Sequence, residues 1–145
     1  MERFLPRDFQ LPNLDSYNAP FFTDGRLQIQ FCGECDHAQH PPDDVCYACQ
    51  GNDLEFRSMP GGGKIESFVV IHHPVHPALK DKVPFAVALV SVDGAPGCNV
   101  LGNVPGADPG DLQIGQRVHV VFEDVTNEAT GEALKIPQWE LRSAS

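Results

Sequence analysis

The sequence predicts a mainly β protein in three consecutive parts: a short N-terminal helix, a metal-binding ribbon and a five-stranded barrel. Two Cys-x-x-Cys pairs lie close together in the first third of the chain. Five segments rich in Val, Ile or Phe follow, each bounded by Gly, Pro, Asn or Asp. A length of 145 residues suits one ordinary domain, or a small domain with a metal-stapled module, and excludes a two-domain enzyme.

The first part, residues 1–25, contains three prolines that interrupt any long helix. We expect at most one short helical turn over residues 19–24, because a glycine follows it. Phe21 and Phe22 lie within this turn and need apolar surroundings. They either cover the protein's own core or form a partner interface, and the sequence leaves both alternatives open.

The second part, residues 26–59, begins with a run of alternating apolar and polar residues at 27–31. This period is typical of a half-buried strand. Residues 54–56 offer a closing strand after the second cysteine pair. A module of about 30 residues cannot build an adequate hydrophobic core, so it needs a covalent or metal staple.

Cys32, Cys35, Cys46 and Cys49 are the predicted metal ligands. Each Cys-x-x-Cys turn places two thiolates on one side of the backbone, with Gly33 easing the first turn and Gly51 following the second. Two such turns complete tetrahedral coordination of zinc, and four thiolates leave no position for an activated water. We therefore expect a structural zinc ion.

Two alternatives to zinc remain at this stage. Two disulfides fit poorly with a chain that has no secretion signal. Iron in a thiolate site satisfies the same ligands and would imply electron transfer, which metal analysis would decide. His37 and His40 lie between the cysteine pairs, and we expect them to be solvated loop residues.

The third part, residues 60–145, is predicted to be all β. Residues 61–63 are three glycines and are expected to form a flexible joint. A single helical turn is expected near residues 108–112. Five strands in about 80 residues can close into an OB-fold barrel, and the expected strands are residues 64–72, 85–93, 98–104, 117–126 and 134–141.

Several residues of this part have side chains that often carry out chemistry, but we assign none of them a catalytic role. Cys98 begins a strand and has no nearby base in sequence, so we expect a buried packing residue. His72, His73 and His76 occupy a proline-stiffened extended loop, for which facing solvent or a partner is favoured over catalysis. The acidic residues at 123, 124 and 128 are expected to form a solvated face.

The formal net charge is -10, with 10 Lys+Arg against 20 Asp+Glu. This balance argues against nucleic acid as a partner, since counterion release needs a local surplus of cations. No segment approaches the ~20 apolar residues of a membrane span, and the N-terminus lacks the apolar run of a secretion signal. We expect a cytoplasmic protein that binds neither nucleic acid nor membrane.

The ordered set of motifs resembles the acyl-CoA-associated OB-fold proteins that carry an N-terminal rubredoxin-like zinc ribbon. The resemblance rests on residues 25–35, on Pro41-Pro42 before the second cysteine pair, and on residues 63–72, 76–79, 83–90 and 114–122. It spans nearly the whole chain. This chain departs from the family at Tyr47 and Gln50, where Pro and Gly are common, which changes the surface of the second turn but keeps all four ligands.

The resemblance implies a non-catalytic accessory subunit that pairs with a thiolase-fold catalytic subunit. A coenzyme A thioester would be the substrate of the complex, in a β-ketothiolase or a retro-aldol/Claisen C–C cleavage. The small subunit of a thiolase acting on an aromatic acyl-CoA such as benzoylsuccinyl-CoA is the most specific expectation, and no CoA-binding residue is assigned.

Two other functions are kept as alternatives. Zinc ribbons and OB-folds also form nucleic-acid-binding modules. A stand-alone acyl-CoA thioester enzyme would use His72, His73 or His76.

Overall fold

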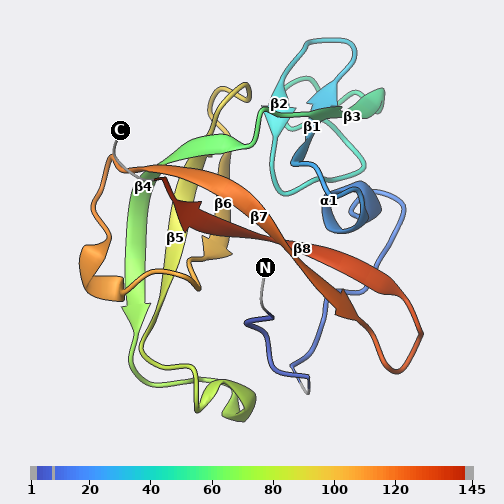
Figure 1. Ribbon diagram of the computed structural model, residues 1–145. Helices are drawn as coiled ribbons and strands as arrows, with labels where there is room; N and C mark the ends of the chain where they lie inside the picture. The colour runs from blue at the N-terminus through green and yellow to red at the C-terminus, as the bar shows by residue number, and fades with distance from the viewer. Residues whose placement is uncertain (1–2, 8, 143–145) are drawn as a thin grey trace.

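The computed structural model describes residues 3–7 and 9–142, which form two antiparallel β-sheets. The smaller sheet has the order β2-β1-β3 and the larger has the order β6-β5-β4-β7-β8. Figure 1 shows the smaller sheet above one end of the larger one, with helix α1 beside them. The predicted mainly β architecture with an OB-fold is confirmed.

Helix α1 (Ala19–Thr23) is the predicted short turn, and the backbone of Gly25 then takes a positive φ of 83°. Phe21 is buried in the main core, where its ring lies 4.8 Å from that of His40 and 5.0 Å from that of Phe22. Of the two alternatives for Phe21, packing on the protein's own core is therefore correct, and a partner interface is not needed to bury it.

The smaller sheet consists of β1 (Gln28–Cys32), β2 (Ala38–Gln39) and β3 (Leu54–Ser58). Every residue of β1 is buried, whereas the sequence predicted a half-buried strand. The polar side chains of β1 are covered by other segments: Gln30, 3% exposed, bonds to Asp43 of the loop between β2 and β3. Gln28, 6% exposed, bonds to Asp24 and to Ser58 of β3. Strand β2 was not predicted, because two residues carry no periodic signal.

The larger sheet consists of five strands in antiparallel pairs. In β5 the inward residues alternate along the strand, and Ala86, Ala88 and Val90 are all fully buried. The strands are β4 (Gly62–Ile71), β5 (Phe85–Val92), β6 (Asn99–Asn103), β7 (Arg117–Thr126) and β8 (Ala133–Leu141).

The glycine run at the start of β4 is not the expected flexible joint. The carbonyl groups of Gly61 and Gly62 accept hydrogen bonds from Val120 and Asp93 at 2.8 and 3.1 Å. A Cβ on Gly63 would overlap the side chain of Val90 in the adjacent strand. These glycines are needed for close packing, so the two sheets are joined by ordered backbone.

Two 3-10 turns occupy the long connections. The second (Pro109–Asp111) lies in the segment where one helical turn was expected. The first (Pro77–Leu79) lies in the histidine loop, which was predicted to be extended throughout. His76 caps this turn, because its Nδ1 accepts a hydrogen bond from the Ala78 amide at 3.0 Å.

The barrel closes where β6 meets β8 without a backbone ladder between them. Trp139 of β8 is 1% exposed and covers Gly102 of β6. Beside it, the Gln138 Oε1 accepts a hydrogen bond from the Asn103 amide at 3.0 Å. We call this junction of β6 and β8 the seam. Side chains of β8 connect the two strands there, whereas backbone hydrogen bonds connect the other strand pairs.

Glu123 is completely buried, which corrects the prediction of a solvated acidic face at that residue. Its two carboxylate oxygens accept hydrogen bonds from the amides of Phe4 and Leu5, at 2.7 and 2.9 Å. Asp124, the next residue, does point outward and pairs with Lys135 at 2.6 Å. Glu123 fastens the N-terminal segment to β7.

Within the described part of the chain, no helix is long and apolar enough to cross a membrane.

We predict that Gly102→Ala destabilises the barrel. A Cβ at this position would lie 2.8 Å from Trp139 Cδ1, and overpacking of a core costs about 1–3 kcal/mol. Gly106→Ala is the control, because a Cβ there meets nothing within 4 Å. Urea denaturation followed by far-UV circular dichroism gives both values, and equal midpoints for the two variants would contradict the packing described at the seam.

Candidate metal centre

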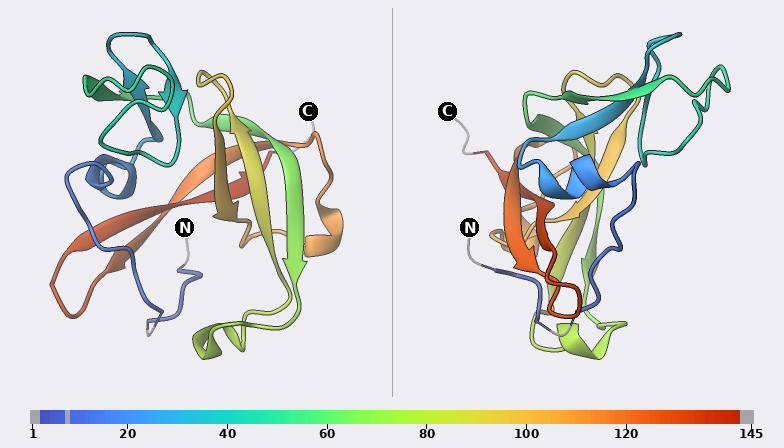
Figure 2. Two further views of the ribbon diagram at one scale, coloured as in Figure 1. Left: turned by 180° about the vertical axis from the view of Figure 1, so that it is seen from behind. Right: turned by 90° about the vertical axis from the view of Figure 1, so that its right-hand side faces the viewer.

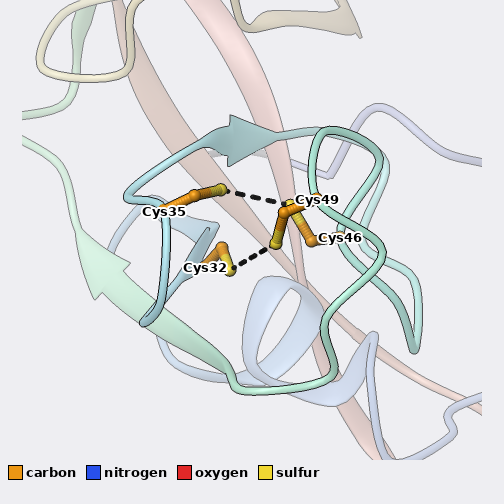
Figure 3. A group of neighbouring side chains, drawn as sticks. All are labelled: Cys32, Cys35, Cys46 and Cys49. Carbon is orange, nitrogen blue, oxygen red and sulfur yellow. Dashed lines mark hydrogen bonds between the residues drawn. The ribbon is translucent and has the colours of Figure 1, made fainter.

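The four cysteines come from two turns that face each other, with the sulfur atoms between them (Figure 3). Cys32 ends β1 and Cys35 lies in the turn that follows, while Cys46 and Cys49 lie in the loop before β3. All four sulfur atoms are within 4.8 Å of one another. The Sγ–Sγ distance is 3.6 Å both for Cys32 and Cys49 and for Cys35 and Cys46.

The two turns share one backbone conformation. The amide of Asp36 donates to the carbonyl of Cys32, and the amide of Gln50 donates to that of Cys46, both at 2.9 Å. Asp36 and Gln50 each take a φ of 63°. The left-handed residue thus stands immediately after the second cysteine of each pair.

Gly33 was predicted to ease the first turn, but neither it nor Gly51 has a positive φ, and both glycines are explained by close contacts instead. A Cβ on Gly33 would lie 2.6 Å from the carboxylate of Asp53. A Cβ on Gly51 would lie 3.3 Å from the sulfur of Cys49 and would overlap the carboxylate of Glu34. Both glycines let neighbouring segments approach the sulfur cluster closely.

Backbone amides point at the sulfur atoms. Ala48 donates to Cys46 Sγ and Gly51 donates to Cys49 Sγ, each at 3.4 Å. The Cys49 amide, more than any other group, lowers the pKa of the Cys46 thiol to about 7 against the opposing effect of burial. Such donors stabilise a thiolate, which is the form that ligates metals. At Cys49 the Gly51 amide acts in the same direction, but the thiol of Cys32 and burial raise the pKa of Cys49 on balance.

The geometry fits zinc. A tetrahedral ion with bonds of about 2.3 Å to sulfur separates its ligands by roughly 3.8 Å, close to the 3.6 Å distances here. Among the described residues, these cysteines are the only group of three or more Cys, His, Asp or Glu side chains arranged to hold a metal. The four together could hold an ion such as zinc, whose contribution would be to cross-link the two turns.

A buried pair of glutamines supports the site, and the sequence analysis missed it. Gln39 Nε2 donates to Gln30 Oε1 at 2.8 Å and to the carbonyl of Val45 at 3.0 Å. Gln30 in turn donates to the carbonyl of Asp43 at 2.7 Å, and Gln39 Oε1 accepts from the Tyr47 amide at 2.9 Å. These bonds hold the loop that carries the second cysteine pair. Only the tertiary fold reveals them, because polar residues on a strand ordinarily indicate solvent exposure.

The histidines between the cysteine pairs have different environments. His37 is exposed as expected. His40 is largely buried, contrary to the prediction, because its ring packs on Phe21 of α1. Burial lowers the pKa of His40 to about 4, so its imidazole is neutral near pH 7.

The remaining predicted residues lie away from the cysteines in the fold. Cys98 is 4% exposed in the main core, and burial raises the pKa of its thiol, in agreement with a packing role. His72 and His73 are exposed on the loop after β4, whereas His76 packs on Phe9 with ring centroids 5.2 Å apart.

The comparisons with known proteins agree with this architecture. Residues 56–123 match the family described as "ChsH2, C-terminal OB-fold domain". A solved structure, the "Ltp2-ChsH2(DUF35) aldolase", contains a chain that superposes with a TM-score of 0.71 at 31% identity. The match covers 90% of this protein and 98% of that chain.

Three curated relatives were also found. A "DUF35 domain-containing scaffold protein" of Methanothermobacter thermautotrophicus is 32% identical over 98 residues, which are 67% of this chain and 71% of that protein. A "Probable enoyl-CoA hydratase alpha subunit" of Thermomonospora curvata is 33% identical, covering 89% of this chain and 41% of that protein. For the "3-oxo-4,17-pregnadiene-20-carboxyl-CoA hydratase alpha subunit" of Mycobacterium tuberculosis these values are 32%, 83% and 38%.

A small sheet carrying four clustered cysteines and an OB-fold define a ribbon-plus-barrel protein. The chain belongs to the DUF35 family, with the OB-fold of ChsH2. It spans about two fifths of the length of the two hydratase alpha subunits that it matches.

We predict that Cys32→Ser abolishes metal binding and unfolds the ribbon while the barrel stays folded. A structural zinc contributes on the order of 10 kcal/mol to a module of this size. Elemental analysis measures the metal, and amide NMR spectra separate signals of the two sheets. Cys98→Ala is the control and should keep a full complement of zinc. Retention of stoichiometric zinc by Cys32→Ser would contradict the assignment, and iron in the unmodified protein would favour the electron-transfer alternative.

We predict that Gln50→Gly tightens zinc binding. Gln50 has a φ of 63°, which destabilises the backbone by roughly 1 kcal/mol when the residue has a side chain. Glycine lacks this strain, so the affinity of the folded loop for zinc should rise about two- to fivefold. Asn52→Gly is the control, because Asn52 is an exposed residue of the same loop and its φ is not positive. Glycine there only adds flexibility to the loop, so this variant should bind zinc slightly more weakly. Competition with a chromophoric chelator measures both, and an equal response would show that Gln50 carries no strain.

Proposed function

We propose that this protein is a non-catalytic accessory subunit that carries a structural zinc ion on Cys32, Cys35, Cys46 and Cys49. It associates with a thiolase-fold catalytic subunit that acts on an acyl-CoA. The observation that carries the proposal is the match to the DUF35 chain of the Ltp2-ChsH2(DUF35) aldolase, which extends over 98% of that chain. The hydratase alpha subunits support the same substrate class, because their names describe CoA thioesters.

The chemistry of the site supports a non-catalytic role. Four thiolates fill a tetrahedral ion and leave no position for substrate or water. Among the described residues, the four cysteines are the only group arranged to hold a metal. The side chains of Gln30 and Gln39 beside them hold the loop of the second cysteine pair in place. The metal therefore keeps the ribbon folded in this proposal, and the catalytic groups come from the partner.

The reaction of the complex is proposed to be C–C bond cleavage. The aldolase match is nearly complete on both chains, whereas the hydratase alpha subunits are more than twice as long as the matched region. Within this class, a β-ketothiolase reaction on an aromatic acyl-CoA such as benzoylsuccinyl-CoA is the most specific form of the proposal. The name of a DUF35 scaffold protein among the relatives supports the accessory role itself.

Ion pairs within the chain argue against the alternative of a nucleic-acid-binding module. Five of the ten Lys and Arg side chains form ion pairs with carboxylates of the same chain: Arg26, Arg57, Lys64, Arg117 and Lys135. Phosphate binding needs cations that are free to release counterions from the nucleic acid. A salt-sensitive gel shift at moderate protein concentration would revive this alternative.

Co-expression with thiolase-fold proteins encoded nearby tests the proposal. We expect one of them to co-purify with this chain and to cleave an acyl-CoA, while the isolated chain shows no thioester turnover. Turnover by the isolated chain, lost when His72, His73 and His76 are changed to Ala, would instead establish the stand-alone enzyme. Failure of every thiolase-fold candidate to bind would overturn the proposed partner.

A further inference from the structure

A groove of about 910 Å³ lies along the seam of the barrel. Its walls come from the N-terminal segment, helix α1, the loop at residues 40–42 and the outer surface of β5, β6 and β8. Figure 2 shows the N-terminal segment and α1 passing beside β8, as the contacts between α1 and β8 require. Its size falls within the range of about 300–1,000 Å³ that is typical of small-molecule sites.

The groove carries no formal charge. Among the described residues that line it, none is Asp, Glu, Lys or Arg, although 21% of the chain is charged. Phe9, Phe22, Leu101 and Ile136 provide much of the apolar surface, and Leu101 is 63% exposed. His40 also lines the groove and is neutral near pH 7. An ion would lose its hydration here without gaining an opposite charge, so the groove suits an uncharged molecule.

Gln138 supplies an unused hydrogen-bond donor in the wall. The side chain is 99% buried, since only 1% of its surface is exposed. Its Oε1 is occupied by the Asn103 amide, which fixes the orientation of the carboxamide. Its Nε2 has no hydrogen-bond partner among the described residues, and it is the only buried side-chain N or O atom there of which this is true. The atom itself has less than 1 Å² of accessible surface, so a ligand oxygen reaches it by displacing the side chains that cover it. An unpaired buried donor costs about 1–3 kcal/mol, which a ligand carrying an acceptor recovers.

His76 supplies a second donor. Its Nδ1 accepts the Ala78 amide, so the proton of the neutral imidazole resides on Nε2. The ring packs on Phe9, which keeps it in the wall of the groove. Because their acceptor atoms are occupied, Gln138 and His76 each retain an N–H for a ligand. The carboxamide of Asn18, which also lines the groove, is bonded through both of its polar atoms.

We propose that this groove binds an uncharged, largely apolar molecule with a carbonyl oxygen, which accepts a hydrogen bond from Gln138 Nε2. His76 Nε2 is the donor for a second acceptor on a longer ligand. The inference is independent of the proposed catalytic partner, because it concerns the zinc-loaded chain alone.

A matched pair of probes tests the carbonyl. Dibenzyl ketone and 1,3-diphenylpropane have the same shape and differ by one C=O group. We expect the ketone to bind about tenfold more tightly, because a net hydrogen bond is worth about 1 kcal/mol and spares the buried donor. The ketone, but not the hydrocarbon, should shift the side-chain amide NMR signal of Gln138. The carboxylate 3-phenylpropanoate should not bind.

Variants locate the site. Leu101→Glu introduces a charge on an exposed wall residue, where folding tolerates it, and should weaken ketone binding at least about tenfold. Ile114→Glu is the control, because Ile114 is 70% exposed and does not line the groove. Gln138→Met should remove the preference for the ketone over the hydrocarbon. If this variant does not fold, the Gln138 amide signal of the unmodified protein provides the same test.

Several results would overturn the inference. Equal affinity for ketone and hydrocarbon would remove the role of the donor, and an unmoved Gln138 amide signal would place the ketone elsewhere. Binding of 3-phenylpropanoate as tight as that of the ketone would show that the groove accepts charge. Absence of binding by either neutral probe up to its solubility limit would exclude this class of ligand.

Discussion

The packing of Trp139 against Gly102 is the contact on which much of this structure depends. An open five-stranded sheet leaves two edges, and here β6 and β8 come together without a backbone ladder. The indole covers the glycine, and the carboxamide of Gln138 takes up the Asn103 amide that a neighbouring strand would otherwise satisfy. Unpaired strand edges promote association with other chains, so closing the edge with side chains is also protective.

The seam also determines where the other parts of the chain lie. Helix α1 packs on β8 and contributes Phe21 to the barrel core. The N-terminal segment before α1 is fastened to β7 by the buried carboxylate of Glu123. Because a buried carboxylate is costly without donors, the two amides it accepts must remain in place. This arrangement holds the N-terminal segment at the edge of the groove.

The ribbon depends on polar contacts rather than on a core of its own. Gln30 and Gln39 bind four backbone groups of the loop that carries Cys46, so their carboxamides help to position this loop. His40 and Phe21 then join the ribbon to α1 and the barrel. A metal at the sulfur cluster would add a cross-link between the two turns to these polar contacts, so the final conformation of the loop needs both.

The sequence predicted the features that follow from local periodicity. The five barrel strands and the helical turn at α1 lie close to their predicted residues, because alternating apolar positions and flanking turn residues are local signals. The cysteine pairs were recognisable from spacing alone, and the sulfur atoms do converge.

What the sequence did not predict depends on contacts between distant segments. Glu123 resembled a surface residue because Asp124 and Glu128 lie close to it in sequence. Its carboxylate nevertheless accepts hydrogen bonds from the amides of Phe4 and Leu5, which are 119 and 118 positions away. The polar face of β1 resembled a solvated face in sequence, but residues distant from it cover Gln30 and Gln28, Asp43 and Ser58 among them. The glycines at residues 61–63 resembled a linker, but packing against Val90 explains at least one of them better than flexibility does.

The charged residues of the described chain lie outside the groove. Most of the acidic residues that produce the net charge of -10 are exposed, and several pair with neighbouring cations. The groove, by contrast, has no Asp, Glu, Lys or Arg among its described lining residues. In the proposed function, a coenzyme A phosphate finds no counter-charge in the groove and would need basic groups from the proposed partner. What this chain offers is neutral surface with fixed N–H donors, which suits recognition of the apolar part of a molecule rather than of its anionic part.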